Sequence, residues 1–150
     1  MKPLVMTPDV NILVACARSD HVHHMVARAW LDGAMSSCAR GGTVKLMPMV
    51  VASFLRLVTN PRIFETPMPV ESAVAFVDAL LAVPGVDMVS LGAEWLVLRQ
   101  LCLGLQLTGN ALPDAWLAAA VQYGGGHLVT FDKDFKKLLG RAQLTVLETG

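Results

Sequence analysis

One segment, LPDAWLAAAVQYGGGHLVTFDKDF at residues 112–135, constrains the fold more than any other part of the chain. Its pattern predicts a helix that begins at Pro113 and Asp114 and ends at the glycines of 124–126, because proline is favoured in a first helical turn and glycine just after the last. The apolar residues of 127–130 then predict a short strand. A helix that leads through a tight turn into a buried strand is typical of an α/β protein.

The rest of the chain alternates in the same way. Proline at position 8 is predicted to end the first strand, because it cannot donate a hydrogen bond to a neighbouring strand. Strands are predicted at 4–6, 43–47, 86–91, 127–130 and 144–147, and helices from 12 to the break at 19–20, at 21–39, from 48 to near 60, at 70–83, around 95–105, from 113 to 124 and at 135–139. This order predicts a short, mostly parallel sheet with helices on both faces.

Length and composition limit the classes of protein that fit. A chain of 150 residues suits one domain, here residues 1–150, with a full hydrophobic core. Hydrophobic residues make up 54% and charged residues 16%, an apolar excess that indicates a partner surface. No apolar run reaches the ~18 residues of a membrane span, and the beginning is a poor signal peptide, so we expect a cytoplasmic protein. Twelve basic and twelve acidic residues cancel, so any nucleic-acid binding must be local.

The cysteines and one histidine group have simple interpretations. The cysteines are odd in number and lack CxxC spacing, which indicates free thiols rather than a disulfide framework or zinc site: Cys16, Cys38 and Cys102. His21, His23 and His24 could form a metal cluster, but their position at the start of an amphipathic helix favours ordinary histidines.

Three aspartates are the candidate catalytic and metal-binding residues. Asp9 follows the first predicted strand, Asp132 follows the fourth, and Asp114 begins the helix before it. Because the carboxyl ends of parallel strands meet at one edge, these carboxylates can converge there and raise one another's pKa. Mg²⁺ would relieve the repulsion, since it prefers oxygen ligands. Asn11 and Thr130 are polar residues that flank the same edge.

Each aspartate also has a purely structural interpretation. Asp after a strand or before a helix is ordinarily an N-cap or a partner of the helix dipole, and Asn11 or Thr130 could form a local turn bond. Asp134 is interpreted as a solvent-facing residue or a cap of the last helix. A magnesium ion held by the three acids would activate water and stabilise the leaving oxygen in phosphodiester hydrolysis, so cleavage of a nucleic-acid backbone fits best.

Basic residues near these acids are candidates for RNA contact. Arg56 and Arg62 lie near the end of the third predicted helix, and Lys133 follows Asp132. Bound RNA requires cations beside the metal, because phosphate contacts dominate affinity. The lysines could equally form a solvated helix face, and Arg56 could pair with an acid inside the fold.

Two other phosphoryl-transfer classes fit less well. Haloacid-dehalogenase-like phosphatases also place Asp after the first strand, but they need a second acid where this chain has Asn11. Receiver domains need an acid directly after a middle strand, and residues 86–91 are followed by no acid before Glu94. Both classes are therefore disfavoured.

Four segments together resemble a known family. DVNILV, FLRLVTNPRIF, LPDAWLAAAVQYGG and LVTFDKDF are similar, in this order, to the PIN-domain ribonucleases and, among them, to the VapC-like toxins of type II toxin–antitoxin pairs. The resemblance implies a three-layer α/β/α fold, Mg²⁺- or Mn²⁺-dependent endonucleolytic cleavage of structured RNA such as tRNA or rRNA, and neutralisation by a small antitoxin. A homodimer is also expected, in keeping with the apolar excess.

The family's metal-binding acids correspond to Asp9, Asp114 and Asp132, and its supporting polar residues to Asn11 and Thr130. One departure concerns the third helix, where many relatives carry a Glu and this chain has Ser53. Weaker metal binding would follow. The alternative function is therefore a PIN-like domain with weakened or absent catalysis that binds RNA or a protein partner.

Overall fold

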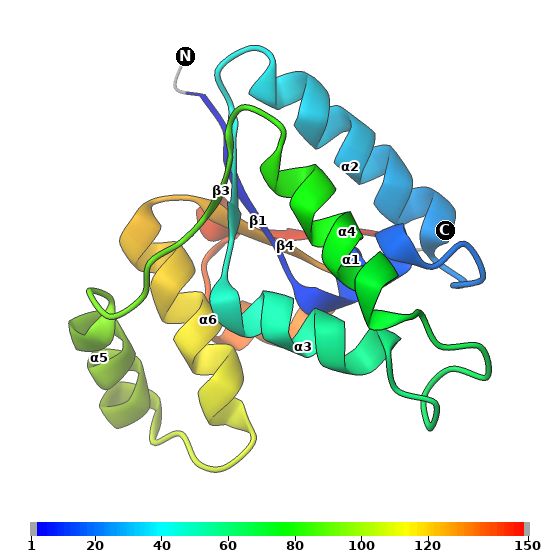
Figure 1. Ribbon diagram of the computed structural model, residues 1–150. Helices are drawn as coiled ribbons and strands as arrows, with labels where there is room; N and C mark the ends of the chain where they lie inside the picture. Colours follow the sequence, from blue (N-terminus) through cyan, green and yellow to red (C-terminus); the bar gives the residue numbers. More distant parts are fainter. Residues whose placement is uncertain (1–2, 149–150) are drawn as a thin grey trace.

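The computed structural model describes residues 3–148. Its helices and strands alternate along most of the chain (Figure 1). In chain order they are β1 (Val5–Pro8), α1 (Val10–Ala17), α2 (His24–Cys38), β2 (Thr43–Leu46), α3 (Pro48–Val58), α4 (Val70–Leu81), β3 (Val86–Met88), α5 (Trp95–Leu105), α6 (Ala111–Gly124), β4 (His127–Thr130), the 3-10 helices η1 (Lys133–Lys137) and η2 (Arg141–Gln143), and β5 (Leu144–Val146).

The five strands form one sheet in the order β3-β2-β1-β4-β5, and every pairing is parallel. From β1 the chain moves through α1–α4 to β2 and β3, and it then returns through α5 and α6 to β4 on the other side of β1. Because parallel crossovers are right-handed, this reversal puts the two helix groups on opposite faces, as Figure 1 shows. The predicted α/β/α fold with a parallel sheet is confirmed.

The core lies on both faces of the sheet. Its largest fully buried side chains include Phe54, Ile12 and Leu13. The buried face of α6 consists largely of alanine, at Ala115 and at 118–120. These small side chains let the α6 backbone lie close to β4 and to α5.

Several element boundaries differ from the sequence predictions. β1 extends through Pro8, which pairs with Val129 at the strand's last position, and the next ladder bond runs from the Asp9 backbone N–H to the Val129 oxygen at 2.8 Å. The strand therefore ends at Pro8, as predicted, although it runs two residues beyond the predicted range 4–6. α2 begins at His24 rather than residue 21, since residues 18–24 form successive turns. β3 ends at Met88, three residues earlier than predicted.

The geometry of the turn between α6 and β4 explains why Gly125 and Gly126 are glycines. Gly125 adopts φ +73° at the end of α6, and a Cβ at Gly126 would lie 2.7 Å from both Cγ1 and the backbone oxygen of Val5. We expect Gly126→Ala to lower the free energy of unfolding by about 2 kcal/mol, because β1 would have to move. Gly124→Ala is the matched control: no heavy atom lies within 4 Å of its added Cβ, and it should stabilise by about 0.5 kcal/mol. Urea denaturation of both variants distinguishes these effects; equal stabilities would contradict the close approach.

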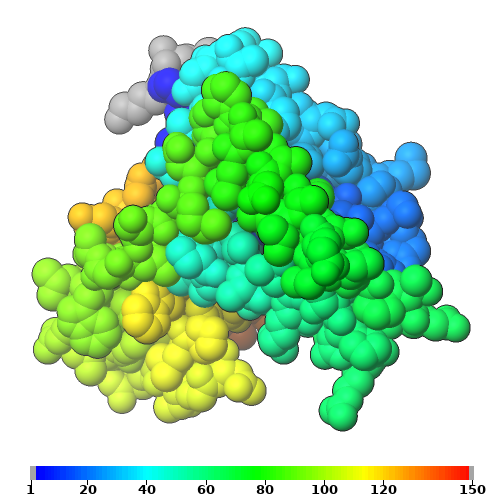
Figure 2. Space-filling view, in the orientation of Figure 1, coloured from blue at the N-terminus to red at the C-terminus, as the bar shows by residue number. Residues whose placement is uncertain are grey.

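An apolar surface covers the outer side of α5 and α6. We call it the α5–α6 surface, and its exposed side chains are Trp95, Leu96, Leu103, Leu105, Leu112, Trp116 and Tyr123. In the space-filling view the outer residues of both helices occupy one corner of the molecule, and the surface is indented between the start of α6, in yellow, and the connection after α3 (Figure 2). Part of the apolar excess of the composition lies on this surface.

Within residues 3–148, no helix combines the length and hydropathy that a membrane crossing requires.

The cysteine side chains are free thiols, as predicted. Cys16 and Cys38 are buried and Cys102 is partly buried. Burial raises the pKa of Cys16 to about 12, so this thiol stays protonated and unreactive at neutral pH.

Candidate active site

The candidate site lies where the strand order reverses. β1 and β4 are neighbours in the sheet, yet the chain leaves β1 in one direction and reaches β4 from the other. Asp9 directly follows β1, Asp132 comes two residues after β4, and Asp114 lies in the first turn of α6. Open α/β sheets place their ligands at the carboxyl ends of strands on either side of such a switch point. We call the region around these three side chains the acidic crevice.

Asp9 is the most buried of the three acids, with 7% of its surface exposed. Its Oδ1 accepts the Val10 backbone N–H at 2.7 Å, so it caps α1, and its Oδ2 accepts the Thr130 hydroxyl at 2.8 Å. Asp132 likewise accepts the Asp134 backbone N–H at 2.8 Å and caps η1. The capping interpretation therefore holds for both residues, and it fixes their carboxylates at the edge of the sheet.

The Thr130 side chain connects both sides of the crevice. This fully buried hydroxyl donates to Asp9 and accepts hydrogen bonds from Asn11 Nδ2 at 3.2 Å and the Asp132 backbone N–H at 3.0 Å. Asn11 Oδ1 in turn accepts the backbone N–H of Phe131 at 3.4 Å. Thus Asn11 and Thr130, both predicted as supporting residues, form the hydrogen-bond network that orients Asp9 relative to Asp132.

Removing this hydroxyl should cost stability. We expect Thr130→Val to lower the free energy of unfolding by about 2 kcal/mol, because Asn11 Nδ2 and the Asp132 N–H lose a buried acceptor. Thr130→Ser keeps the hydroxyl and should cost about half as much, for one lost buried methyl group. Denaturant titration of the two variants makes the comparison. If both lose the same stability, packing and not hydrogen bonding fixes this residue.

The acids influence one another's ionisation. Desolvation by burial raises the pKa of Asp9, and the charges of Asp114 and Asp132 raise it further against the lowering effect of its hydrogen bonds. The pKa of Asp114 is also raised, first by desolvation and then by the charges of Asp132 and Asp134. Negative charge is thus concentrated in the crevice, which favours binding of a cation.

The residues present fit a hard, water-carrying cation. Within the described range 3–148, no three Asp, Glu, His or Cys side chains are close enough to bind one ion directly without rearrangement. The available donors are carboxylate, hydroxyl and amide oxygens, which suit Mg²⁺ or Mn²⁺ rather than zinc. Mg²⁺ usually retains several waters and takes only one or two protein carboxylates, so separated carboxylates are compatible with it.

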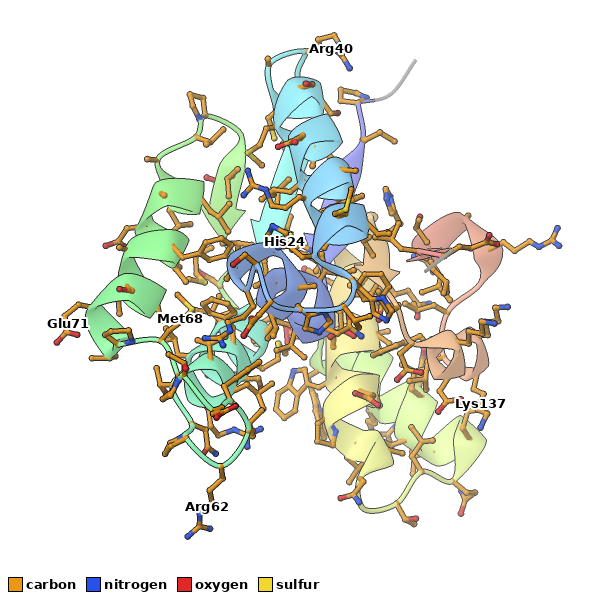
Figure 3. All side chains as sticks on the ribbon, turned by 90° about the vertical axis from the view of Figure 1, so that its right-hand side faces the viewer. His24, Arg40, Arg62, Met68, Glu71 and Lys137 are labelled. Carbon is orange, nitrogen blue, oxygen red and sulfur yellow. The ribbon has the colours of Figure 1, made fainter. Side chains whose placement is uncertain are left out.

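The predicted RNA-contacting residues are exposed at different places. Lys133 lies in η1 beside Asp132, Arg56 lies in the last turn of α3, and Arg62 extends outward from the connection after α3 (Figure 3). Arg56 forms no ion pair among residues 3–148, so the alternative that it pairs with an acid inside the fold is wrong. Lys137, also in η1, borders a hollow of about 460 Å³ together with Asp114 and Asp134.

Glu94 is a functional candidate that sequence reasoning missed. It is 2% exposed, and its carboxylate accepts the Gly92 backbone N–H at 2.7 Å and Trp116 Nε1–H at 2.8 Å. Burial opposes its ionisation, but these hydrogen bonds outweigh burial and lower its pKa. Trp116 lies two residues after Asp114 on α6, so Glu94 supports the helix turn that carries this acid. No spacing rule reveals such a contact. Ser53, where the resemblance led us to expect a Glu, is partly buried in α3.

Comparison with known proteins identifies the family. The PIN domain model matches residues 6–139, which include all three crevice acids. The chain belongs to the PIN-domain family. Ribonuclease VapC25 of Mycobacterium tuberculosis is 41% identical over 130 residues, which cover 86% of this chain and 89% of that relative. This PIN chain is therefore also a member of the VapC group, and the predicted family is confirmed.

Solved structures share the fold of this PIN domain. The VapBC2 complex of Rickettsia felis, bound to a promoter DNA fragment, matches with a TM-score of 0.66 and 15% identity, covering 97% of this chain and all of that one. Mycobacterium tuberculosis VapC20, described as a sarcin–ricin loop cleaving toxin, matches with a TM-score of 0.57 and 17% identity over 88% of this chain and 92% of its own. At these identities the likeness establishes the fold.

Proposed function

We propose that this protein is a divalent-metal-dependent endoribonuclease and the toxin of a toxin–antitoxin pair. The observation that carries the proposal is the charge-coupled trio of Asp9, Asp114 and Asp132 at the switch point of a PIN-domain sheet. The 41% identity to a protein named a ribonuclease supports the same reaction.

The crevice residues have separate roles in this proposal. Asp9, Asp114 and Asp132 would hold Mg²⁺ or Mn²⁺, in part through waters that the ion retains, and such an ion would supply charge neutralisation at the phosphate and a more acidic water. The Thr130 hydroxyl keeps Asp9 Oδ2 oriented through their 2.8 Å hydrogen bond. Asn11 holds Thr130 and the backbone of Phe131, so the carboxylate positions are set before substrate arrives.

Exposed cations would contact the RNA backbone on both sides of the crevice. Lys133 and Lys137 lie on the η1 side, and Arg56 and Arg62 lie on the α3 side. We propose structured RNA, tRNA or rRNA, as the substrate, and the sarcin–ricin loop activity in the description of VapC20 favours rRNA. Such a substrate places the activity in the cytoplasm.

We further propose a small antitoxin as the physiological partner, since the VapBC2 structure contains a toxin and an antitoxin of this kind. The α5–α6 surface gives the chain a second interface, which we assign to a homodimer. An exposed apolar surface with two tryptophans, Trp95 and Trp116, fits an interface between protein chains, where aromatic residues are enriched.

The test is cleavage of RNA by protein that has been freed of any partner. Total RNA incubated with the wild type and Mg²⁺ or Mn²⁺ should give discrete fragments, and EDTA should prevent their formation. Intact RNA under all metal conditions, together with measurable RNA or protein binding, would favour the alternative of a PIN domain without catalysis. Ser53→Glu then tests the missing acid: a gain in cleavage would identify Ser53 as the cause of weak metal binding.

A further inference from the structure

Three aromatic rings lead from the acidic crevice to the connection between α1 and α2. Phe131, between Thr130 and Asp132, lies with its ring centroid 5.0 Å from that of His23, and His23 lies 5.6 Å from His21. We call these residues the ring ladder. We propose that the His21 end of this ladder forms one wall of a subsite that receives an unpaired nucleobase of the RNA, next to the phosphate cleaved in the crevice.

A hollow beside the ladder supplies the space for a base. It measures about 370 Å³ and lies between α1 and the connection after α3, and the residues that border it include Asn11, His21, Val14, Leu57, Ile63 and Phe64. Asn11 also belongs to the crevice network, so the hollow and the acids share a residue. Its volume is in the range of small-ligand sites, and its walls are apolar except for an amide and an imidazole. Such walls suit a flat, weakly hydrated base.

Hydrogen bonds hold the two ends of the ladder. His21 Nδ1 accepts the His23 backbone N–H at 3.0 Å, which orients the His21 ring, and the Phe131 backbone N–H donates to Asn11 Oδ1. The adjacent His24, at the centre of the side shown in Figure 3, donates from Nδ1 to the Ala15 backbone oxygen at 2.7 Å. A base in the hollow would therefore stack on a His21 ring that is already in place, which lowers the entropic cost of binding.

Charges around the hollow favour a base over a phosphate. The nearby Arg18 is buried, pairs with Asp20 at 2.6 Å, donates to the Thr66 oxygen at 2.7 Å and stacks on Phe64, so its charge is already satisfied. Desolvation and the neighbouring His23 lower the pKa of His21, which leaves that imidazole neutral at pH 7. Stacking on aromatic side chains is the usual way in which proteins hold unpaired bases.

The experiment measures binding without cleavage, because the inference rests on the proposed function. Wild type and variants are titrated in EDTA with a short single-stranded RNA of mixed sequence and with an abasic chain of the same length. His21→Asn removes the ring but keeps an acceptor for the His23 N–H, and it should weaken binding of the base-containing RNA about tenfold. Binding of the abasic chain should not change.

Val22→Ala serves as the control. It changes a side chain that is 85% exposed on the same connection and lies outside the ring ladder, so it should bind like the wild type. Equal loss for the base-containing and abasic chains would overturn the proposal. Unchanged RNA binding by His21→Asn would also overturn the proposal. This holds even if that variant releases a small co-purified protein, because the hollow would then bind protein and not a base. If the wild type binds RNA in EDTA but does not cleave it with Mg²⁺ or Mn²⁺, the nuclease proposal is contradicted and the base subsite is not.

Discussion

Replacing Asp9 with asparagine is expected to reduce RNA cleavage at least about a hundredfold while leaving the fold intact. Residues that only support a metal ligand already contribute 10- to 100-fold, so loss of a proposed ligand should cost no less. Asparagine keeps an oxygen that can accept the Thr130 hydroxyl or the Val10 N–H, the two hydrogen bonds that fix Asp9. The change therefore removes charge with little change in shape.

The effect on stability should have the opposite sign. The folded state raises the pKa of Asp9 above its ordinary value of 3.8, so the ionised carboxylate is less favourable in the folded than in the unfolded chain. This destabilisation is fully present above the folded-state pKa and disappears as the pH falls toward 3.8. In EDTA, Asp9→Asn should thus melt at or above the wild-type temperature at pH 7, and this difference should vanish in acid.

Cleavage assays and thermal melts of the same preparations make the measurement. Asp78→Asn is the matched control, since Asp78 is exposed on α4 and lies outside the crevice, and it should leave cleavage unchanged. Mg²⁺ should raise the melting temperature of the wild type more than that of Asp9→Asn. A large fall in melting temperature for Asp9→Asn would contradict this prediction, because it would show that the capping hydrogen bonds of Asp9 stabilise the fold by more than its charge destabilises it.

Glu94→Ala is expected to be the most destabilising of the substitutions considered. It leaves the Gly92 N–H and the Trp116 Nε1–H without their charged acceptor at a position that is 2% exposed. Hydrogen bonds to charged groups contribute 1.5–3 kcal/mol each, so the loss should be about 3 kcal/mol, or roughly 10 °C in melting temperature. Cleavage by the remaining folded protein should also fall, because Trp116 would no longer fix the turn that carries Asp114.

The pH dependence of this loss follows from the lowered pKa of Glu94. A carboxyl whose pKa is lower in the folded state contributes stability above its ordinary value of 4.5, and that contribution is lost as the pH falls through the folded-state pKa. The difference between wild type and Glu94→Ala should therefore be largest near neutral pH and shrink in acid. Glu71→Ala, at an exposed acid of α4, should show no such difference. A constant difference at all pH values would attribute the effect to packing alone.

The helices and strands could be predicted from the sequence because each has a recognisable local pattern of apolar and turn residues. Alternation of apolar segments and turn residues located all five strands, and the Pro113 and Gly125 signals located α6 to within two residues at each end. The position of an acid after a strand was enough to assign Asp9 and Asp132 to one edge, because parallel strands share their direction. That these two acids are neighbours depends on the pairing of β1 with β4, and the local sequence pattern did not specify the order of the strands.

Contacts between distant side chains were not predictable in the same way. Glu94 lies in a loop that looks ordinary, and its partner Trp116 reads as one more apolar residue of α6. Likewise, His23 and Phe131 meet only because α1 and β4 pack together. β1 runs two residues beyond the predicted range, because the missing donor of Pro8 matters inside a strand, whereas the last position of a strand can do without a donor. Rules based on local sequence therefore fail to predict structure that is determined by packing between distant segments.

The pairing of β1 with β4 has a consequence for the newly made protein. Met6 to Pro8 align with His127 to Val129, so the first strand has its central partner only after most of the chain has been synthesised. Asp9 and Asp132 cannot approach each other in a shorter nascent chain, because loop closure over this separation must come first. The acidic crevice therefore cannot assemble until β4 has emerged from the exit tunnel of the ribosome. Before that point a partner can bind the nascent chain while it is still inactive.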